Sequence, residues 1–167
     1  AAWCRAAAAH PDLHHFVVGN RSGDAYEQQL VDIVKTAGME ERVHFLGNID
    51  EAHKIELLQR AELFVHTPVT AEDGGFEGFG IVYLEAAASG TPSIGTLDCG
   101  AEDAIVDGET GLLVQQNVEA ATEALERLLG DDELRKQMGE AGREHAAVQN
   151  WESNAVQVAT IYRESLC

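Results

Sequence analysis

The residues best suited to chemistry lie in one continuous stretch, residues 74–92. The stretch begins as a glycine-rich loop and continues with the apolar spacing of a helix that ends at Gly90. Two carboxylates, Glu77 and Glu85, are separated by roughly 12 Å along a helix axis, at about 1.5 Å per residue. The first N–H groups of such a helix can bind a phosphate, and carboxylates accept hydrogen bonds from sugar hydroxyls. The order of groups therefore suits a sugar–diphosphate–ribose ligand.

This spacing alone leaves two interpretations open, because a plain glycine turn before an exposed helix gives the same pattern. Other segments of the chain help to decide between these two interpretations. Four of them resemble, in the same order, the signature of the family 4 (group 1) retaining glycosyltransferases, which have the GT-B fold. They are residues 42–49, 61–68, 77–92 and 107–114, and the similarity extends over most of residues 13–166.

The resemblance implies a cleft between two Rossmann-like domains that binds a nucleotide-sugar donor. It implies that Glu77 is the catalytic residue that accepts hydrogen bonds from the transferred sugar, and that Glu85 accepts both ribose hydroxyls. The plain structural alternative for both glutamates is an exposed helix face; for other residues of the site it is packing (Phe79, Ile49) or the turn itself (Gly80). The other donor contacts that the resemblance implies, to the sugar, the distal phosphate and the nucleobase, fall on Gly78, Phe79, Gly80, Ile81, Asn48 and Ile49.

The implied reaction transfers a glycosyl group with retention at the anomeric carbon, and it requires stabilisation of the charge on the leaving diphosphate. In the family an Arg and a Lys do most of this. Neither Arg5 nor Arg21 has the matching position, so we expect the pair upstream of Ala1. We therefore expect the 167-residue chain alone to bind donor weakly and to have no transferase activity.

No metal or other cofactor is expected, because the resembling family usually needs no metal and the sequence contains no Asp-x-Asp element. Asp98, Glu102 and Asp103 are a candidate carboxylate cluster, for which we favour a solvated loop. The resemblance is imperfect here, since the family has a Gly-Gly pair where this chain has Asp98-Cys99-Gly100. A donor contact from that loop is therefore in doubt.

The apolar periodicity predicts strands that alternate with helices. Such an order is typical of an α/β fold, a Rossmann-like parallel sheet with helices on both faces, as in the C-terminal half of a GT-B fold. Ligands of such sheets bind beyond the carboxyl ends of the strands. We expect residues 1–167 to form a single nucleotide-sugar-binding domain without the N-terminal acceptor domain. The expected strands are 14–19, 43–46, 63–66, 92–95 and 111–114, and the expected helices are 1–9, 26–37, 51–60, 101–106, 118–129, 134–148 and 151–166, besides the one that ends at Gly90.

The charge balance restricts the partners. The chain has 29 acidic and 11 basic residues, a formal net charge of −18, which repels nucleic acids and anionic surfaces. A high-salt cytoplasm is one hypothesis for this acidity. The three cysteines show no C-x-x-C spacing, which argues against a disulfide framework and a structural zinc site and favours a reducing, cytoplasmic location.

The donor is expected to be GDP-mannose-like or a UDP-sugar. The acceptor, a glycan or a lipid-linked molecule, is expected to bind mainly to the N-terminal domain. Peripheral membrane association is an expectation for the full-length protein only.

Other functions remain open from the residues. A sugar phosphorylase on the same fold needs a cofactor-bearing lysine, and none of Lys35, Lys54 and Lys136 is expected near the glycine-rich stretch. A nucleotide-sugar epimerase shares the cleft. A non-catalytic nucleotide-binding or interaction module is also compatible, although both glutamates are present. A dinucleotide-binding dehydrogenase is disfavoured, because residues 19–23 do not fit Gly-x-Gly-x-x-Gly.

Overall fold

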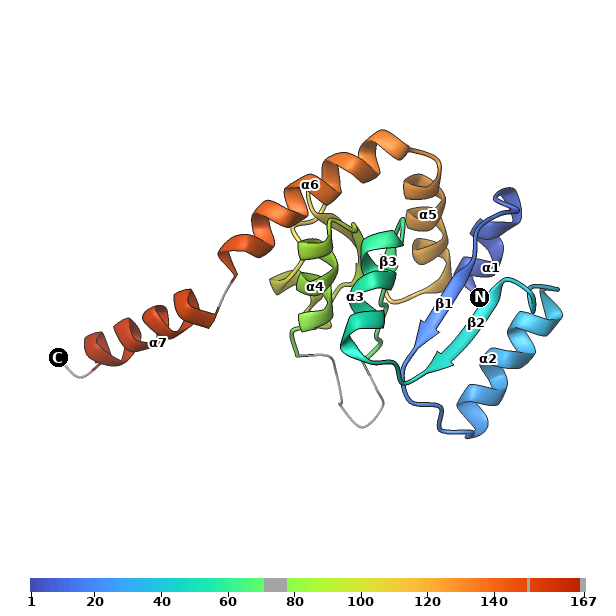
Figure 1. Cartoon of the computed structure of the whole chain (residues 1–167), viewed down its shortest axis with the longest axis horizontal. Helices are drawn as coiled ribbons and strands as arrows, with labels where there is room; N and C mark the ends of the chain where they lie inside the picture. The colour runs from blue at the N-terminus through green and yellow to red at the C-terminus, as the bar shows by residue number, and fades with distance from the viewer. Residues whose placement is uncertain (71–77, 150, 166–167) are drawn as a thin grey trace.

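The computed structural model of the chain describes residues 1–70, 78–149 and 151–165. Within these residues, five parallel strands form two sheets (Figure 1). One sheet pairs β1 (His15–Val18) with β2 (Val43–Gly47). The other has the order β3–β4–β5, with the strands Phe64–Val65, Ser93–Thr96 and Gly111–Val114.

Helices connect the strands, and short polar side chains start several of them. Asp24, Asp50, Asn117 and Asp131 are N-caps, and each side chain accepts a hydrogen bond of 2.8–2.9 Å from the backbone N–H three residues later. The helical segments are α1 (Ala2–Ala6), the 3-10 helix η1 (Ala7–Ala9), α2 (Ala25–Thr36), α3 (Glu51–Arg60), α4 (Ile81–Ser89), the 3-10 helix η2 (Ala101–Asp103), α5 (Val118–Leu129), α6 (Asp132–Val148) and α7 (Trp151–Ser165).

The predicted alternation of parallel strands with helices is confirmed. Two details differ. The helix expected at 101–106 is only the short η2, because the N–H of Val106 bonds to the hydroxyl of Thr110 (2.9 Å) and not to a carbonyl one turn earlier. The strands also form two sheets rather than one, since no ladder joins β1 to β3 in the part of the chain that the structure describes.

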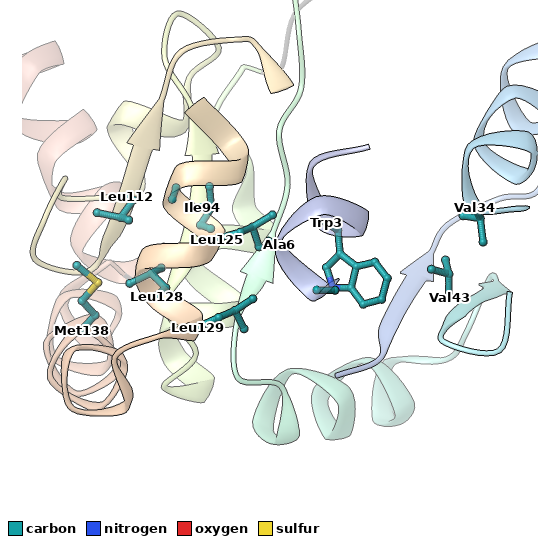
Figure 2. Packing of buried hydrophobic residues seen from close by; sticks show 12 residues of the cluster. Trp3, Ala6, Val34, Val43, Ile94, Leu112, Leu125, Leu128, Leu129 and Met138 are labelled. Carbon is teal, nitrogen blue, oxygen red and sulfur yellow. The ribbon is translucent and has the colours of Figure 1, made fainter. Parts of the chain in front are cut away.

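Helices cover both faces of the three-stranded sheet. Successive side chains of each strand point to opposite faces, so each strand contributes to two separate clusters. Ile94 and Leu112 belong to the larger core cluster, shown in Figure 2 with residues of α1, α5 and α6. Phe64 and Leu113 pack instead on a smaller cluster around Tyr83 of α4. The face that carries α4 is therefore separate from the face that carries α1 and α5.

Helix α6 holds the C-terminal half of α4 by close backbone contact. A Cβ atom at Gly139 would lie 2.3 Å from the carbonyl oxygen of Gly90, so only glycine permits this approach. Arg143 donates a hydrogen bond from Nη2 to the carbonyl of Ser89 (3.0 Å). Gly90 ends α4 with φ +80°, as the sequence predicts. These contacts fix the helix at the end opposite its first turn.

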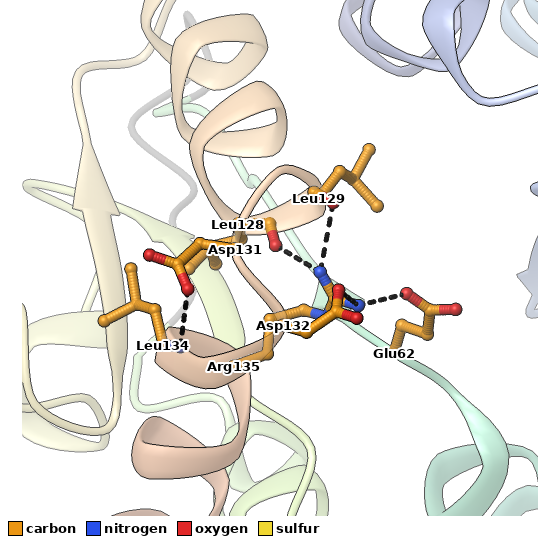
Figure 3. A network of polar contacts seen from close by, with 7 residues as sticks. All are labelled: Glu62, Leu128, Leu129, Asp131, Asp132, Leu134 and Arg135. Atoms are coloured by element: carbon orange, nitrogen blue, oxygen red, sulfur yellow. Dashed lines mark hydrogen bonds and ion pairs between the residues drawn. The ribbon is translucent and has the colours of Figure 1, made fainter.

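Arg135 joins α5 to α6 and to the segment before β3 (Figure 3). Its guanidinium donates to the carbonyls of Leu128 (2.6 Å) and Leu129 (3.1 Å), which end α5. It also pairs with Glu62 (2.7 Å) and Asp132 (2.6 Å). A cation at the end of a helix complements its unpaired carbonyls. The same region contains a shallow depression lined by Gly90, Pro92 and Lys136, among others, at the C-terminal end of α4.

Helix α7 extends away from the rest of the chain (Figure 1). None of its described residues is buried. No helix in the described ranges is long and apolar enough to cross a membrane.

Candidate functional site

Helix α4 begins at the carboxyl edge of the sheet, where a glycine turns the chain. Gly80 has φ +72° and ψ +64°, a left-handed conformation that glycine adopts without a steric penalty. Gly78 is exposed, and Phe79 packs on the smaller core cluster. Ile81 is 56% exposed and Tyr83 is buried, so only one side of the first turn of α4 faces solvent. Backbone N–H groups at the start of a helix can bind an anion in such a position.

Glu85 lies one turn further along α4 and is held by a lysine from α3. Its Oε1 atom is 2.8 Å from Nζ of Lys54. Lys54 also pairs with Glu51 of its own helix at 3.0 Å. The side chains of Lys54 and Glu85 are 27% and 35% exposed, respectively. The carboxylate is therefore oriented by its neighbour and still accessible to a ligand.

This contact corrects the prediction that no lysine lies near the glycine-rich stretch. Helices α3 and α4 pack side by side, which brings Lys54 to Glu85 although 31 positions separate them. The hydrogen bonds from Lys54 to Glu85 and then to Glu51 raise the pKa of the lysine above its ordinary value. Lys54 is therefore a protonated cation at neutral pH, beside the carboxylate.

The turn at Asn48 and Ile49 leads directly into the helix that carries Lys54. Asn48 is exposed and Ile49 is half-buried, and both follow the last residue of β2. Asp50 then caps α3 by accepting a hydrogen bond from the N–H of His53 (2.8 Å). This bond lowers the pKa of Asp50. The structure thus places the turn at the start of α3, and the middle of α3 against α4.

The segment after β3 is tied to the ends of β4 and β5. The hydroxyl of Thr96 donates to the carbonyl of Pro68 (2.5 Å), and the N–H of Thr70 donates to Oε1 of Gln116 (3.0 Å). On the other side, the hydroxyl of Tyr83 donates to the carbonyl of His66 (2.6 Å). The first part of the loop that leads to α4 is therefore anchored at the carboxyl edge of the sheet.

A carboxylate of the loop after β4 takes part in the loop's own hydrogen bonds. Asp98 has φ +60°, and its N–H donates to Oε2 of Glu102 (3.0 Å). The carboxylate of Glu102 therefore stabilises the turn of the loop at Asp98. Among the described residues no group of three or more His, Cys, Asp or Glu could hold a metal ion.

The structure therefore brings together Glu85, the start of α4 and, through Lys54, the helix that follows Asn48 and Ile49. Glu77, the candidate catalytic residue, lies outside the described residues. The sequence analysis did not find Lys54. The sequence around Lys54 indicates only an ion pair with Glu51, three positions earlier on the same helix. No residue near Lys54 in the sequence indicates that Glu85 is its second partner.

Comparisons with known proteins place the chain in a family. Residues 2–145 match the family model described as "Glycosyl transferases group 1". The D-inositol 3-phosphate glycosyltransferase of Corynebacterium urealyticum is 34% identical over 159 residues, which are 92% of this chain and 36% of that protein. The chain thus spans about a third of this curated relative.

Solved structures agree with this family. Sucrose-phosphate synthase from Thermosynechococcus elongatus superimposes with a TM-score of 0.78 at 31% identity, over 99% of this chain and 41% of that one. The C-terminal domain of the group 1 family protein LpcC from Francisella tularensis gives a TM-score of 0.73 at 28% identity, over 89% and 75% of the two chains. The chain belongs to the group 1 glycosyl transferases and has the Rossmann-like α/β architecture of the GT-B enzymes.

Proposed function

We propose that this chain is the donor-binding domain of a retaining glycosyltransferase. The full-length protein transfers a sugar from a GDP-mannose-like or UDP-sugar donor to a glycan or lipid-linked acceptor. The observation that carries this proposal is the position of Glu85. It lies just beyond the first turn of α4, which begins at the exposed Ile81, and it is held there by Lys54, on the helix that follows the turn at Asn48 and Ile49.

Each group has a role that its chemistry supports. Glu85 accepts hydrogen bonds from the two ribose hydroxyls, because a carboxylate paired with one ammonium retains free lone pairs. The backbone of residues 78–81 faces the distal phosphate and the sugar, and the positive end of α4 stabilises the leaving diphosphate. The backbone of Asn48 and Ile49 contacts the nucleobase. Glu77 accepts hydrogen bonds from the transferred sugar.

The lengths of the relatives support a two-domain protein. About two thirds of the length of the inositol phosphate glycosyltransferase lies outside the matched region. The LpcC structure is described as a C-terminal domain, and this chain covers 75% of its length. We therefore assign the acceptor site, the phosphate-binding Arg and Lys and any peripheral membrane contact to the remainder of the protein. We place the protein in the cytoplasm and expect residues 1–167 alone to be inactive.

The position of Lys54 does not favour the phosphorylase alternative. A lysine that forms a Schiff base with a cofactor reacts as the neutral amine, which a lowered pKa supplies. The two carboxylates beside Lys54 raise its pKa instead. The lysine is therefore suited to an electrostatic role.

The test is the stereochemistry of the product formed by the full-length protein. With an α-linked nucleotide sugar, we expect NMR to show an α-linked product, and Glu77→Gln and Glu85→Gln to reduce transfer at least tenfold. Glu56→Gln on α3, whose carboxylate pairs only with Arg60 in the described residues, is the matched control. A β-linked product would contradict retention. Donor binding without turnover of any sugar would favour the non-catalytic module.

A further inference from the structure

One amide side chain joins three segments at the carboxyl edge of the three-stranded sheet. Gln116 lies just after β5, and it bonds to the segments that follow β3 and β4. Its Oε1 atom accepts a hydrogen bond from the N–H of Thr70 (3.0 Å), and its Nε2 atom donates to the carbonyl of Leu97 (2.9 Å). A side-chain amide has an acceptor and two N–H donors, so it can serve several segments at once.

The Nε2 atom of Gln116 also reaches two further polar atoms of the same segments. It lies 3.2 Å from Sγ of Cys99 and 3.4 Å from Oγ1 of Thr70. Cys99 is fully buried, and the side chain of Gln116 is half-buried. An apolar side chain at position 116 would therefore remove four polar contacts from a site that is partly closed to water.

Other hydrogen bonds hold the strand ends but stop short of these residues. The N–H of Leu97 donates to the carbonyl of Val114 (2.9 Å), and the hydroxyl of Thr96 donates to the carbonyl of Pro68 (2.5 Å). Within the described ranges, the polar contacts of Thr70 are made with Gln116 and Cys99 alone. Gln116 is therefore the tie that continues beyond the ends of the strands.

The loop after β4, which Gln116 holds, packs on the start of α4. Ala101 of this loop is fully buried and belongs to the same cluster as Tyr83, in the first turn of α4. Phe79, just before the helix, packs on that cluster too. The packing is tight, because a Cβ atom at Gly95 would lie 2.9 Å from Cβ of Ala101 and 3.3 Å from the hydroxyl of Tyr83. A shift of the loop would therefore be transmitted to the start of α4.

We propose that Gln116 is a positioning residue for glycosyl transfer. Its amide fixes the loop after β4 and the segment after β3, and through them the start of α4. The inference rests on the proposed function, which assigns the sugar and the distal phosphate of the donor to the backbone of residues 78–81. Gln116 acts through its neighbours, and displacing a reacting group by about 1 Å can cost on the order of 100-fold in rate.

The ribose end of the donor should depend much less on Gln116. Glu85 is held by Lys54 from α3, and the C-terminal end of α4 is held by the close approach of Gly139 to Gly90. None of these contacts involves the loops that Gln116 joins. Loss of the amide should therefore impair the chemical step more than the binding of the donor.

Steady-state kinetics of the full-length protein test this separation. The donors are UDP-glucose and GDP-mannose, assayed at least about 15 °C below the unfolding temperature of each variant, so that unfolding does not contribute. We expect Gln116→Met to lower kcat at least tenfold and to change the KM for the donor less than about threefold. A purely structural role would lower the unfolding temperature without this difference between kcat and KM.

Two further variants keep the measurement specific. Gln116→Glu retains the acceptor for the N–H of Thr70 and lacks only the N–H donors, so it disturbs the fold less, and we expect kcat to fall at least about fivefold. Gln115→Met is the matched control, because the side chain of Gln115 is exposed, and we expect its kcat to stay within about twofold of the wild type.

Glu85→Gln in the same assays separates this inference from the proposed function. Wild-type kcat in both Gln116 variants, beside impaired transfer in Glu85→Gln, would overturn the role of Gln116 alone. An equal loss in Gln115→Met would also overturn it. Unchanged transfer in Glu85→Gln would overturn the proposed donor site and, with it, this inference.

Discussion

At the scale of single residues, the ion pair between Lys54 and Glu85 has two consequences for a ligand. It orients the carboxylate, and it places one of the few positive charges of a chain with a formal net charge of −18 beside the first half of α4. A nucleoside diphosphate needs both an acceptor for its ribose and relief from this negative field. Lys54 is therefore a positioning residue for Glu85 and a local counter-charge.

Removing Lys54 should weaken nucleotide binding. We expect Lys54→Met to lower the affinity of the full-length protein for its nucleoside diphosphate roughly 3- to 10-fold, measured by calorimetry. Glu51→Gln is the control. Glu51, whose side chain is 71% exposed, is the other partner of Lys54, and its substitution leaves the contact with Glu85 in place. Equal losses in both variants would contradict a specific role for the contact with Glu85.

His15 should make stability depend on pH. Burial is the main cause that lowers the pKa of His15 from its ordinary value of 6.5 to about 4. The folded state therefore favours neutral His15, and its contribution to stability, complete above pH 6.5, is lost as the pH falls from 6.5 towards 4. The slope from this group approaches about 1.4 kcal/mol per pH unit.

Urea unfolding of the wild type and of His15→Phe at pH 7 and pH 5 measures this contribution. We expect the wild type to lose more stability than the variant between the two values. The comparison cancels the carboxylates that both proteins share. Parallel losses would show that His15 does not resist protonation.

At the scale of elements, the packing of α6 on α4 fixes the helix that carries Glu85. We expect Gly139→Ala to destabilise the protein by about 1–3 kcal/mol, because its Cβ would meet the backbone of Gly90, which cannot move aside. Gly142→Ala is the matched control on the same helix, since its Cβ would lie 3.4 Å from Ala87, an ordinary contact. Chemical denaturation gives both values. Equal effects would contradict the close approach at Gly139.

Elements with local signals could be predicted from the sequence. Helix α5 occupies 118–129 as expected, because Asn117 caps it and its buried residues, such as Leu125 and Leu128, recur at helical spacing. Asp50 likewise indicates the start of α3. Gly90 indicates the end of α4. In each case the residues that decide the boundary lie within one turn of it.

Features that depend on distant residues could not be predicted. Lys54 meets Glu85 only because α3 packs on α4, and no spacing within either helix shows this. The division of the strands between two sheets depends on pairing between segments far apart in the chain. The extent of η2 depends on the hydroxyl of Thr110, which takes the hydrogen bond that a longer helix would need.

At the scale of the whole molecule, α7 contributes little to the core of residues 1–149. Trp151, Val156, Ile161 and Tyr162 are all exposed on it. We expect deletion of residues 150–167 to change the unfolding temperature of the chain by less than about 3 °C, because no described residue of α7 is buried. Differential scanning calorimetry measures the shift. A larger fall would show that α7 packs on the rest of the domain in solution.

The central claim is that Glu85 and the start of α4 bind a nucleotide-sugar donor. Its most direct test is a calorimetric titration of the full-length protein with UDP, GDP, ADP and inorganic phosphate, beside the Glu85→Ala variant. We expect one nucleoside diphosphate to bind, which would identify the base of the donor. We expect its affinity to fall at least about tenfold in the variant, because two ribose hydroxyls lose their hydrogen-bond acceptor. Binding that Glu85→Ala leaves unchanged would remove Glu85 from the donor site, and no binding of any of the four would contradict the donor-binding function.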